Sequence, residues 1–175
     1  MGCIVAAFLA RGGYEVSLCD VVPALLAPAL DPGIQLEGAE AFRQKVTRTC
    51  LTIDDLAVYQ PEVIFITVKA NALPLIASAI EGFYREGMTV ISWQNGIDTE
   101  LELTKVLGRS GVMRAVVNYG CGLVAPGHVR LPFHHPPHFL QELDPKSKGA
   151  TVAIARRAGF GTSATIPAAG TSSDG

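Results

Sequence analysis

Long apolar stretches separated by segments of helical pattern constrain this chain more than any other feature. The strongest is Glu62–Val68 (EVIFITV), in which large apolar residues follow one another almost without interruption. Such a run is typical of a parallel strand covered on both faces. A second buried strand is expected at Met88–Trp93, and the intervening Leu73–Tyr84 has the spacing of an amphipathic helix. This alternation predicts βαβ units built on a parallel sheet.

The same alternation covers most of the chain. Further strands are expected at Tyr14–Cys19, Val46–Thr52, Val112–Tyr119 and Phe160–Ile166. Further helices are expected at Gly2–Ala10, Pro23–Leu30, Thr99–Leu107 and Thr151–Ala158, with one more beginning at Asp54. Gly120–Pro137 is rich in Gly, Pro and His, and Ala125–His128 has the composition of a hairpin turn. The expected fold class is therefore α/β, a Rossmann-like and mostly parallel sheet with helices on both faces.

Composition excludes several classes of partner. Hydrophobic residues make up 49% of the 175 residues, charged residues 17%, and the net charge is −2, which suits one folded domain. Lys and Arg form no long run, so nucleic acid and anionic membranes are not expected as partners. The four cysteines form no CxxC pair, which argues against zinc and disulfides. The first apolar run is too short to span a bilayer and resembles no leader peptide, so we expect a cytoplasmic protein.

Three expected strands are followed by residues suited to ligand binding, and ligands of such sheets bind beyond the carboxyl ends of the strands. Lys69 follows the first, where burying an ammonium is costly unless it meets an anion; an exposed loop lysine is the alternative. Asn95 follows the second, and its amide can donate to and accept from a keto acid; an Asn-Gly turn is the alternative. Gly120 and Gly122 follow the third, as close-approach glycines or as turn residues.

Two residues near the start of the chain suggest contacts to a nucleotide. Gly2 precedes a helix whose amino end would favour a phosphate, although it could simply begin the helix. Asp20 ends a strand at the spacing of an acid that binds an adenosine ribose, although it could simply form a turn. The four histidines have no acid or cysteine at ligand spacing, so we expect surface residues and no metal site: they are His128, His134, His135 and His138.

Several motifs together carry a family resemblance. In chain order they are Val68-Lys69-Ala70, Gln94-Asn95-Gly96-Ile97 and the turn Pro126-Gly127. Met1–Val5 is similar to the end of a glycine-rich loop, and Ala155–Ile166 to a closing helix and strand. As an ordered set on consecutive strand ends, they resemble the dinucleotide-binding domain of ketopantoate reductase (2-dehydropantoate 2-reductase).

The resemblance implies NADPH-dependent reduction of 2-dehydropantoate to (R)-pantoate, a step towards pantothenate and coenzyme A. It implies cofactor contacts for Gly2, Lys69, Gly120 and Gly122, and contacts to both substrate and cofactor for Asn95. The family carries a basic residue near the position of Asp20 for the 2′-phosphate of NADP. A carboxylate there repels that phosphate, so both NAD and NADP are retained as cofactors.

The resemblance also implies that this chain is partial. We expect residues 1–166 to form a dinucleotide-binding domain that lacks its first strand and first two loop glycines, followed by a disordered tail at 167–175. The family's proton-donating lysine lies in a second, helical domain, and Lys146 and Lys148 come too early to replace it. We therefore expect no catalytic residue in the chain and no activity alone. The alternatives are a 6-phosphogluconate-type or opine-type dehydrogenase, and a non-catalytic remnant; the oligomeric state stays open.

Overall fold

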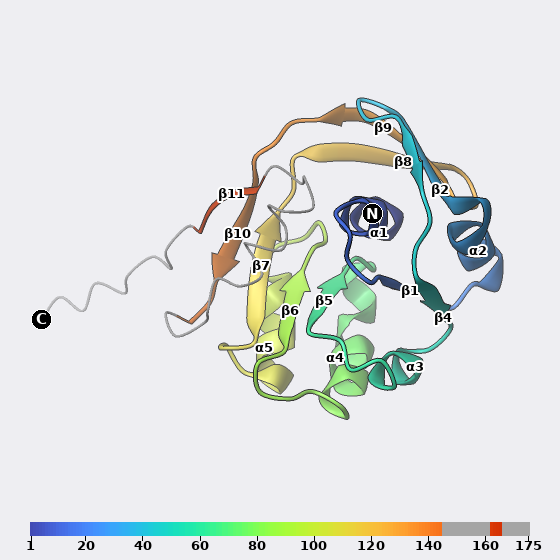
Figure 1. The fold of residues 1–175 in the computed structure, drawn as a ribbon. Helices are drawn as coiled ribbons and strands as arrows, with labels where there is room; N and C mark the ends of the chain where they lie inside the picture. The colour runs from blue at the N-terminus through green and yellow to red at the C-terminus, as the bar shows by residue number, and fades with distance from the viewer. Residues whose placement is uncertain (145–161, 166–175) are drawn as a thin grey trace, which may run out of the picture.

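The computed structural model describes residues 1–144 and the backbone of residues 162–165 (Figure 1). The α-helices are α1 (Gly2–Arg11), α2 (Pro23–Pro28), α3 (Ile53–Ala57), α4 (Leu73–Glu81) and α5 (Thr99–Leu107). The short turns of other helix types are η1 (Ala29–Gly33) and η2 (Ala70–Ala72). The strands are β1 (Ser17–Cys19), β2 (Ile34–Gly38), β3 (Phe42–Gln44), β4 (Arg48–Cys50), β5 (Val63–Ile66), β6 (Thr89–Ser92), β7 (Val112–Val116), β8 (Tyr119–Ala125), β9 (His128–His134), β10 (His138–Glu142) and β11 (Thr162–Thr165).

The largest sheet has the strand order β11-β10-β7-β6-β5. Strands β5, β6 and β7 are parallel, as the alternation of strand and helix predicts, while β10 is antiparallel to β7. In the register, Ile66 of β5 faces Ser92 of β6, which faces Arg114 of β7. The carboxyl ends of the three parallel strands therefore lie at one edge of the sheet.

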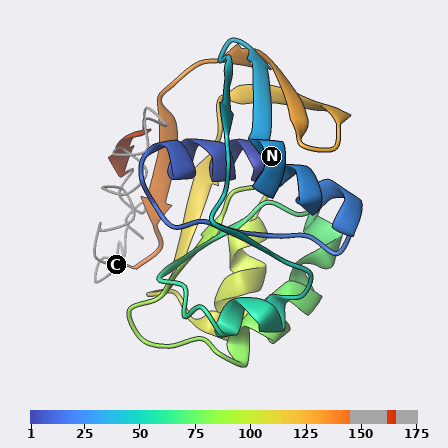
Figure 2. The ribbon, with the colours of Figure 1, turned by 45° about the vertical axis from the view of Figure 1, so that its right-hand side comes forward.

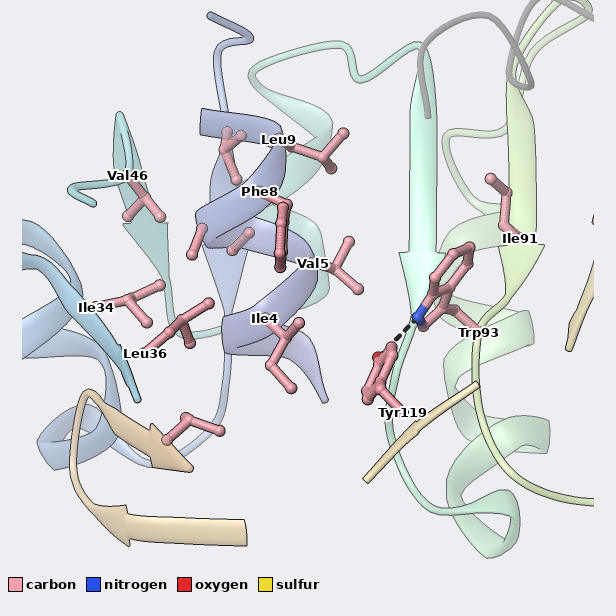
Figure 3. Close-up of a cluster of buried hydrophobic side chains, with 14 of the residues drawn as sticks. Ile4, Val5, Phe8, Leu9, Ile34, Leu36, Val46, Ile91, Trp93 and Tyr119 are labelled. Carbon is pink, nitrogen blue, oxygen red and sulfur yellow. Dashed lines mark hydrogen bonds between the residues drawn. The ribbon is translucent and has the colours of Figure 1, made fainter. Parts of the chain in front are cut away.

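Helices cover both faces of this sheet, which confirms that part of the predicted fold. On one face, Ile64 of β5 and Val90 of β6 pack in a cluster with residues of α4 and α5. On the other face, Ile91 and Trp93 pack against α1, which contributes an unbroken buried run from Ile4 to Leu9 (Figure 3). Alternate residues of each strand thus point into two separate cores.

The large sheet is mostly parallel, as predicted, but two smaller sheets that were not predicted complete the fold. One has the order β3-β2-β9-β8 and packs over α1 on the side away from the large sheet (Figures 1 and 2). Phe8 of α1 meets Phe42 of β3 edge-on, with ring centroids 5.2 Å apart. The other small sheet pairs β1 with β4 in parallel. Residues 34–44, which contain β2 and the three-residue β3, were assigned no element from sequence.

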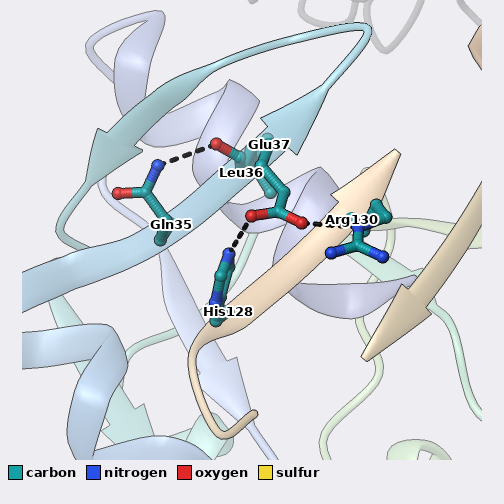
Figure 4. Close-up of polar contacts among 5 residues, drawn as sticks. All are labelled: Gln35, Leu36, Glu37, His128 and Arg130. Carbon is teal, nitrogen blue, oxygen red and sulfur yellow. Dashed lines mark hydrogen bonds and ion pairs between the residues drawn. The ribbon is translucent and has the colours of Figure 1, made fainter. Parts of the chain in front are cut away.

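The four-stranded sheet is held together by residues that are distant in the chain. Strand β9 runs parallel to β2, with Arg130 opposite Glu37. The Glu37 carboxylate accepts a hydrogen bond from Arg130 Nε at 2.5 Å and pairs with His128 Nε2 at 2.7 Å (Figure 4). Arg130 and His128 together lower the pKa of the Glu37 carboxyl. These contacts fix the hairpin β8–β9 against β2.

Other sequence predictions differ from the structure mainly in their boundaries. The helix expected at Thr99–Leu107 has those bounds. The hairpin turn expected at Ala125–His128 is confirmed, and Gly127 occupies it with φ +70°. The strand expected at Val112–Tyr119 is instead two strands in different sheets, β7 and β8. The helix expected at Thr151–Ala158 lies outside the described residues, and β11 falls within the strand expected at Phe160–Ile166.

Within the described part of the chain, no helix combines the length and apolarity that crossing a bilayer requires.

Candidate functional site

Two residues singled out from sequence lie at the carboxyl edge of the parallel strands. Lys69 comes three residues after the end of β5, and Asn95 comes three residues after the end of β6. Because Ile66 and Ser92 are register partners, the two loops leave the sheet side by side. Both Lys69 and Asn95 are exposed to solvent. The structure therefore places an ammonium and an amide on the same edge of the sheet.

Gly2 brings the start of α1 to this edge. A Cβ atom built on Gly2 would lie 2.9 Å from Thr67 Oγ1 and 3.8 Å from Leu18 Cδ1. The helix therefore begins between the carboxyl ends of β5 and β1, in a space where a larger side chain would displace Thr67. Met1, the N-cap residue, provides no side-chain cap, and its carbonyl accepts from the Ile4 and Val5 N–H groups. The Gly2 and Cys3 N–H groups are therefore the ones that remain available to an anion.

Asp20 follows β1 directly and forms a turn. Its Oδ1 accepts a hydrogen bond from the Val22 N–H at 2.9 Å, and its own N–H donates to the Cys50 carbonyl at 3.2 Å. The turn-forming interpretation of Asp20 is thus correct. It does not exclude a ligand, because no residue in the described ranges pairs with Oδ2.

The loop that carries Asn95 is tightly closed. The hydroxyls of Ser92 and Thr99 are hydrogen bonded at 2.8 Å across its base. Gly96 has φ +149°, and a Cβ atom there would lie 2.5 Å from Thr99 Cγ2, so the loop requires glycine. Neighbouring Gln94 is 6% exposed, and neither of its amide atoms has a hydrogen-bond partner among the described residues. Sequence analysis did not single out Gln94, because its burial is not encoded in the motif.

Gly120 and Gly122 lie in strand β8 and not in a turn. They pair with Phe133 and Arg130 of β9, and a Cβ atom on Gly120 would lie 2.6 Å from the Phe133 ring. The turn interpretation of these glycines is therefore wrong. Gly120 directly follows Tyr119, whose hydroxyl accepts a hydrogen bond from Trp93 Nε1 at 2.9 Å, so the beginning of β8 is near the end of β6. A role of the two glycines in cofactor binding stays a prediction.

The prediction that all four histidines lie at the surface is wrong for His134 and His138. The His134 side chain is 5% exposed and His138 is fully buried. The Asn118 N–H donates to His138 Nδ1 at 3.1 Å, so the proton of neutral His138 is on Nε2, which lies 3.0 Å from His134 Nε2. His134 Nδ1 then faces Glu40 Oε1 at 3.2 Å. Burial, and secondly the nearby His134, lower the pKa of His138 to about 4.

Taken together, these features define a class of protein. A helix amino end, a carboxylate, an ammonium and an amide lie beyond the carboxyl ends of parallel strands, as in Rossmann-type dinucleotide-binding domains. The family model described as "Ketopantoate reductase PanE/ApbA" matches residues 1–139. The chain belongs to the ketopantoate reductase family.

Solved structures agree with this assignment at the level of the fold. A 2-dehydropantoate 2-reductase from Porphyromonas gingivalis W83 superposes with a TM-score of 0.78 at 16% identity, covering 94% of this chain and 59% of its own. A PanE/ApbA family ketopantoate reductase from Ralstonia eutropha JMP134 gives 0.69 at 28% identity, with 88% and 49% covered. D-mandelate dehydrogenase with NADH and anilino(oxo)acetate gives 0.72 at 20% identity, with 93% and 52% covered.

The chain thus spans between about half and three fifths of the length of these neighbours. A search of curated protein sequences finds no match.

Proposed function

We propose that this chain forms the nucleotide-binding part of an NAD(P)H-dependent reductase of 2-keto acids, with 2-dehydropantoate as substrate and (R)-pantoate as product. The observation that carries the proposal is the gathering of Gly2, Asp20, Lys69 and Asn95 around the carboxyl ends of β1, β5 and β6. Family membership supports the reaction class. The ligand of the mandelate dehydrogenase structure, anilino(oxo)acetate, is an amide analogue of a 2-keto acid and supports that substrate class.

The residues fit a nicotinamide dinucleotide in their chemistry. The free N–H groups at the start of α1 would face the pyrophosphate, and the absence of a side chain on Gly2 permits close approach. Lys69 would neutralise phosphate charge, and the Asp20 carboxylate would accept hydrogen bonds from the adenosine ribose. The Asn95 amide would orient the keto acid and, after reduction, the hydroxyl of the product. When bound, the nicotinamide supplies the hydride for the ketone carbon.

We propose that NADH binds more tightly than NADPH. The reason is Asp20, whose carboxylate would repel a 2′-phosphate on the same ribose. Arg48, a cation on the neighbouring strand β4, is already paired with Glu15 at 3.0 Å and stacks on Tyr59. The structure of D-mandelate dehydrogenase with NADH supports the choice of that cofactor.

We further propose that residues 1–166 form one Rossmann-like unit, in which β1 and β4 extend the sheet of β5, β6 and β7 across a strand position that is open in this chain. Strand β11, which pairs with β10, supports the extension of the unit to residue 165. A cavity lined by residues of both β1 and β5 supports the open position.

The tryptophan of this chain offers a direct test. Trp93 is its single tryptophan, and it lies two residues before Asn95. NADH bound at the proposed edge should quench Trp93 emission by energy transfer, and this gives a dissociation constant by titration. Lys69→Ala and Asn95→Ala should each weaken binding about tenfold, a loss of about 1.4 kcal/mol. Lys105→Ala, which removes an exposed lysine on α5, should leave the constant unchanged.

Two further measurements test the cofactor preference and the identity of the substrate. Asp20→Asn should narrow the preference for NADH over NADPH, because it removes the repelling charge. Addition of 2-dehydropantoate should tighten NADH binding more than addition of anilino(oxo)acetate. The reverse order would favour another 2-keto acid reductase. Absence of NADH and NADPH binding by the wild-type chain would favour a non-catalytic remnant and contradict the proposal.

A further inference from the structure

Residues 94–98 connect strand β6 to helix α5, and both ends of this loop are anchored. At one end, Trp93 Nε1 donates to the Tyr119 hydroxyl at 2.9 Å (Figure 3). At the other end, the Thr99 hydroxyl is hydrogen bonded to that of Ser92 at 2.8 Å. Trp93 and Thr99 are also buried. A movement of this segment, which we call the 94–98 loop, is therefore confined to its five residues.

Gln94 begins the loop with a side chain that is buried and unpaired. It is 6% exposed, and neither Nε2 nor Oε1 has a hydrogen-bond partner among the described residues. A buried amide without partners loses the hydrogen bonds that it makes to water in the unfolded chain and gains none in return. Such a group requires an explanation, and a reserve of strain that is released on binding is one that proteins use.

Asp98 ends the loop in an unfavourable backbone conformation. Its φ of +57° and ψ of +24° lie in the left-handed region, which residues other than glycine adopt uncommonly. Asp98 is also the N-cap of α5, a position at which aspartate normally has extended backbone angles and accepts a hydrogen bond from the first turn. Here its side chain makes no capping bond. A change of Asp98 to extended angles would relieve the backbone and allow the cap to form.

The tip of the loop places an apolar side chain in solvent. Ile97 is 87% exposed, and no large apolar side chain in the described ranges is more exposed. A single exposed isoleucine needs no explanation by itself. Its position gives it meaning, because it lies two residues after Asn95, at the edge of the sheet where the nucleotide would bind. A ligand held by Asn95 would offer this side chain a surface to pack on.

We propose that the 94–98 loop is a lid, open in this structure, which closes when a nicotinamide dinucleotide binds beside Asn95. In the closed state the Gln94 amide hydrogen bonds to the ligand, Ile97 packs on it, and Asp98 takes extended angles and caps α5. The ligand shifts the loop because these contacts exist only in the closed state. This inference rests on the proposed nucleotide-binding function, and it adds to that site a moving segment and a ligand-binding residue, Gln94.

The variant Gln94→Leu tests the lid through two effects of opposite sign. Because leucine removes two unpartnered polar atoms from a buried position, the Tm of the free chain should rise by about 3 °C. Because the ligand loses its bond to the amide, NADH should bind about tenfold more weakly in the Trp93 titration. Gln35→Leu is the matched control. The Gln35 amide already donates to the Leu36 carbonyl at 2.9 Å on β2, so its loss should not raise the Tm or change NADH binding.

The variant Asp98→Gly tests the other end of the loop. Glycine adopts the left-handed conformation without strain and cannot cap α5, so it should favour the open state and raise the NADH dissociation rate about threefold. Gln60→Gly is the control. Gln60 also has a positive φ, +46°, but it lies at the amino end of β5, whereas Asn95 lies at the carboxyl edge of the sheet. This control should leave the dissociation rate unchanged.

A higher Tm together with weaker NADH binding in Gln94→Leu would support the lid. A lower Tm would show that the amide is satisfied in the free chain and would overturn the proposal. Unchanged NADH binding in either loop variant, with the wild-type chain still binding, would also overturn it while leaving the proposed function intact. Absence of NADH binding by the wild-type chain would contradict both.

Discussion

Strands β6 and β5 are neighbours with similarly apolar sequences, but their surroundings differ. Val90 and Ile91 of β6 are fully buried, and the strand is paired on both edges. Val63 and Phe65 of β5 are partly exposed, and on one edge this strand faces a cavity lined by both β1 and β5, here called the inter-sheet groove. An apolar run therefore reports how well a strand is covered on its faces, whereas the number of partner strands depends on the rest of the fold.

The largest expected effect on stability comes from shortening one side chain in β6 and, for comparison, one in β5. Ile91→Ala should lower the free energy of unfolding by about 3 kcal/mol, because a fully buried side chain leaves a cavity. Val63→Ala should cost about 1 kcal/mol, because the side chain is partly exposed and the groove already admits solvent. Urea unfolding of both variants measures the difference. Equal losses would mean that β5 is packed as tightly as β6, and the contrast would no longer hold.

A smaller effect on stability is expected from His138, which is buried between His134, Trp93 and Tyr119. The pKa of His138 is lowered to about 4, whereas an imidazole in the unfolded chain titrates near about 6.5. The unfolded state therefore binds a proton first as the pH falls. Stability should be complete above about pH 6.5 and should decline by about 2 kcal/mol by about pH 5, with a further loss towards pH 4.

Two histidine variants isolate this contribution. His138→Asn should remove most of the pH dependence between about 6.5 and 4. His135→Asn should retain it, because His135 is exposed and stacks on Phe133, another exposed residue. Urea midpoints measured across this pH range provide the comparison. A decline of the same size in His138→Asn would assign the pH dependence to the carboxylates.

The smallest effect is expected beside the groove, in α3. Thr52 Oγ1 accepts from the Asp55 N–H at 3.2 Å, and Asp55 Oδ2 accepts from the Thr52 N–H at 3.0 Å, which forms a capping box. Thr52→Ala should cost about 1 kcal/mol, seen mainly as faster amide exchange within α3, because that helix has no buried residue. Thr104→Ala on α5 is the control, since its hydroxyl bonds only within its own helix. If Thr52→Ala instead lowered the stability of the whole domain, α3 would be as tightly coupled to the core as β6 is.

The parts of the fold that could be predicted are those with strong local patterns. The β5–α4–β6–α5 succession follows from apolar runs and amphipathic spacing, and α5 was placed to the residue. Strand β2 alternates apolar and polar residues over five positions (IQLEG), a signal that could have found it. Its parallel pairing with β9 could not have been found, because that contact joins residues about ninety positions apart.

In the candidate site, too, some features could be predicted from the sequence and others could not. Lys69 and Asn95 could be placed together because the carboxyl ends of consecutive parallel strands share one edge. The burial of His134 and His138 could not be predicted, because it depends on Glu40 and Asn118 from other elements. Gln94 was missed for the same reason. Its burial depends on residues that are brought around it by folding, and these cannot be read from the adjacent loop residues.

Helix α1 has a consequence for how the molecule assembles. Its residues from Ile4 to Leu9 are made before all of the strands that cover them, namely β6 and β7 on one side and β2 and β9 on the other. Those partners emerge from the ribosome up to about 130 residues later. The apolar residues of α1 therefore stay uncovered until nearly all of the described domain has been translated. Folding dominated by such distant contacts is slow, which makes this helix the segment most in need of protection during biosynthesis.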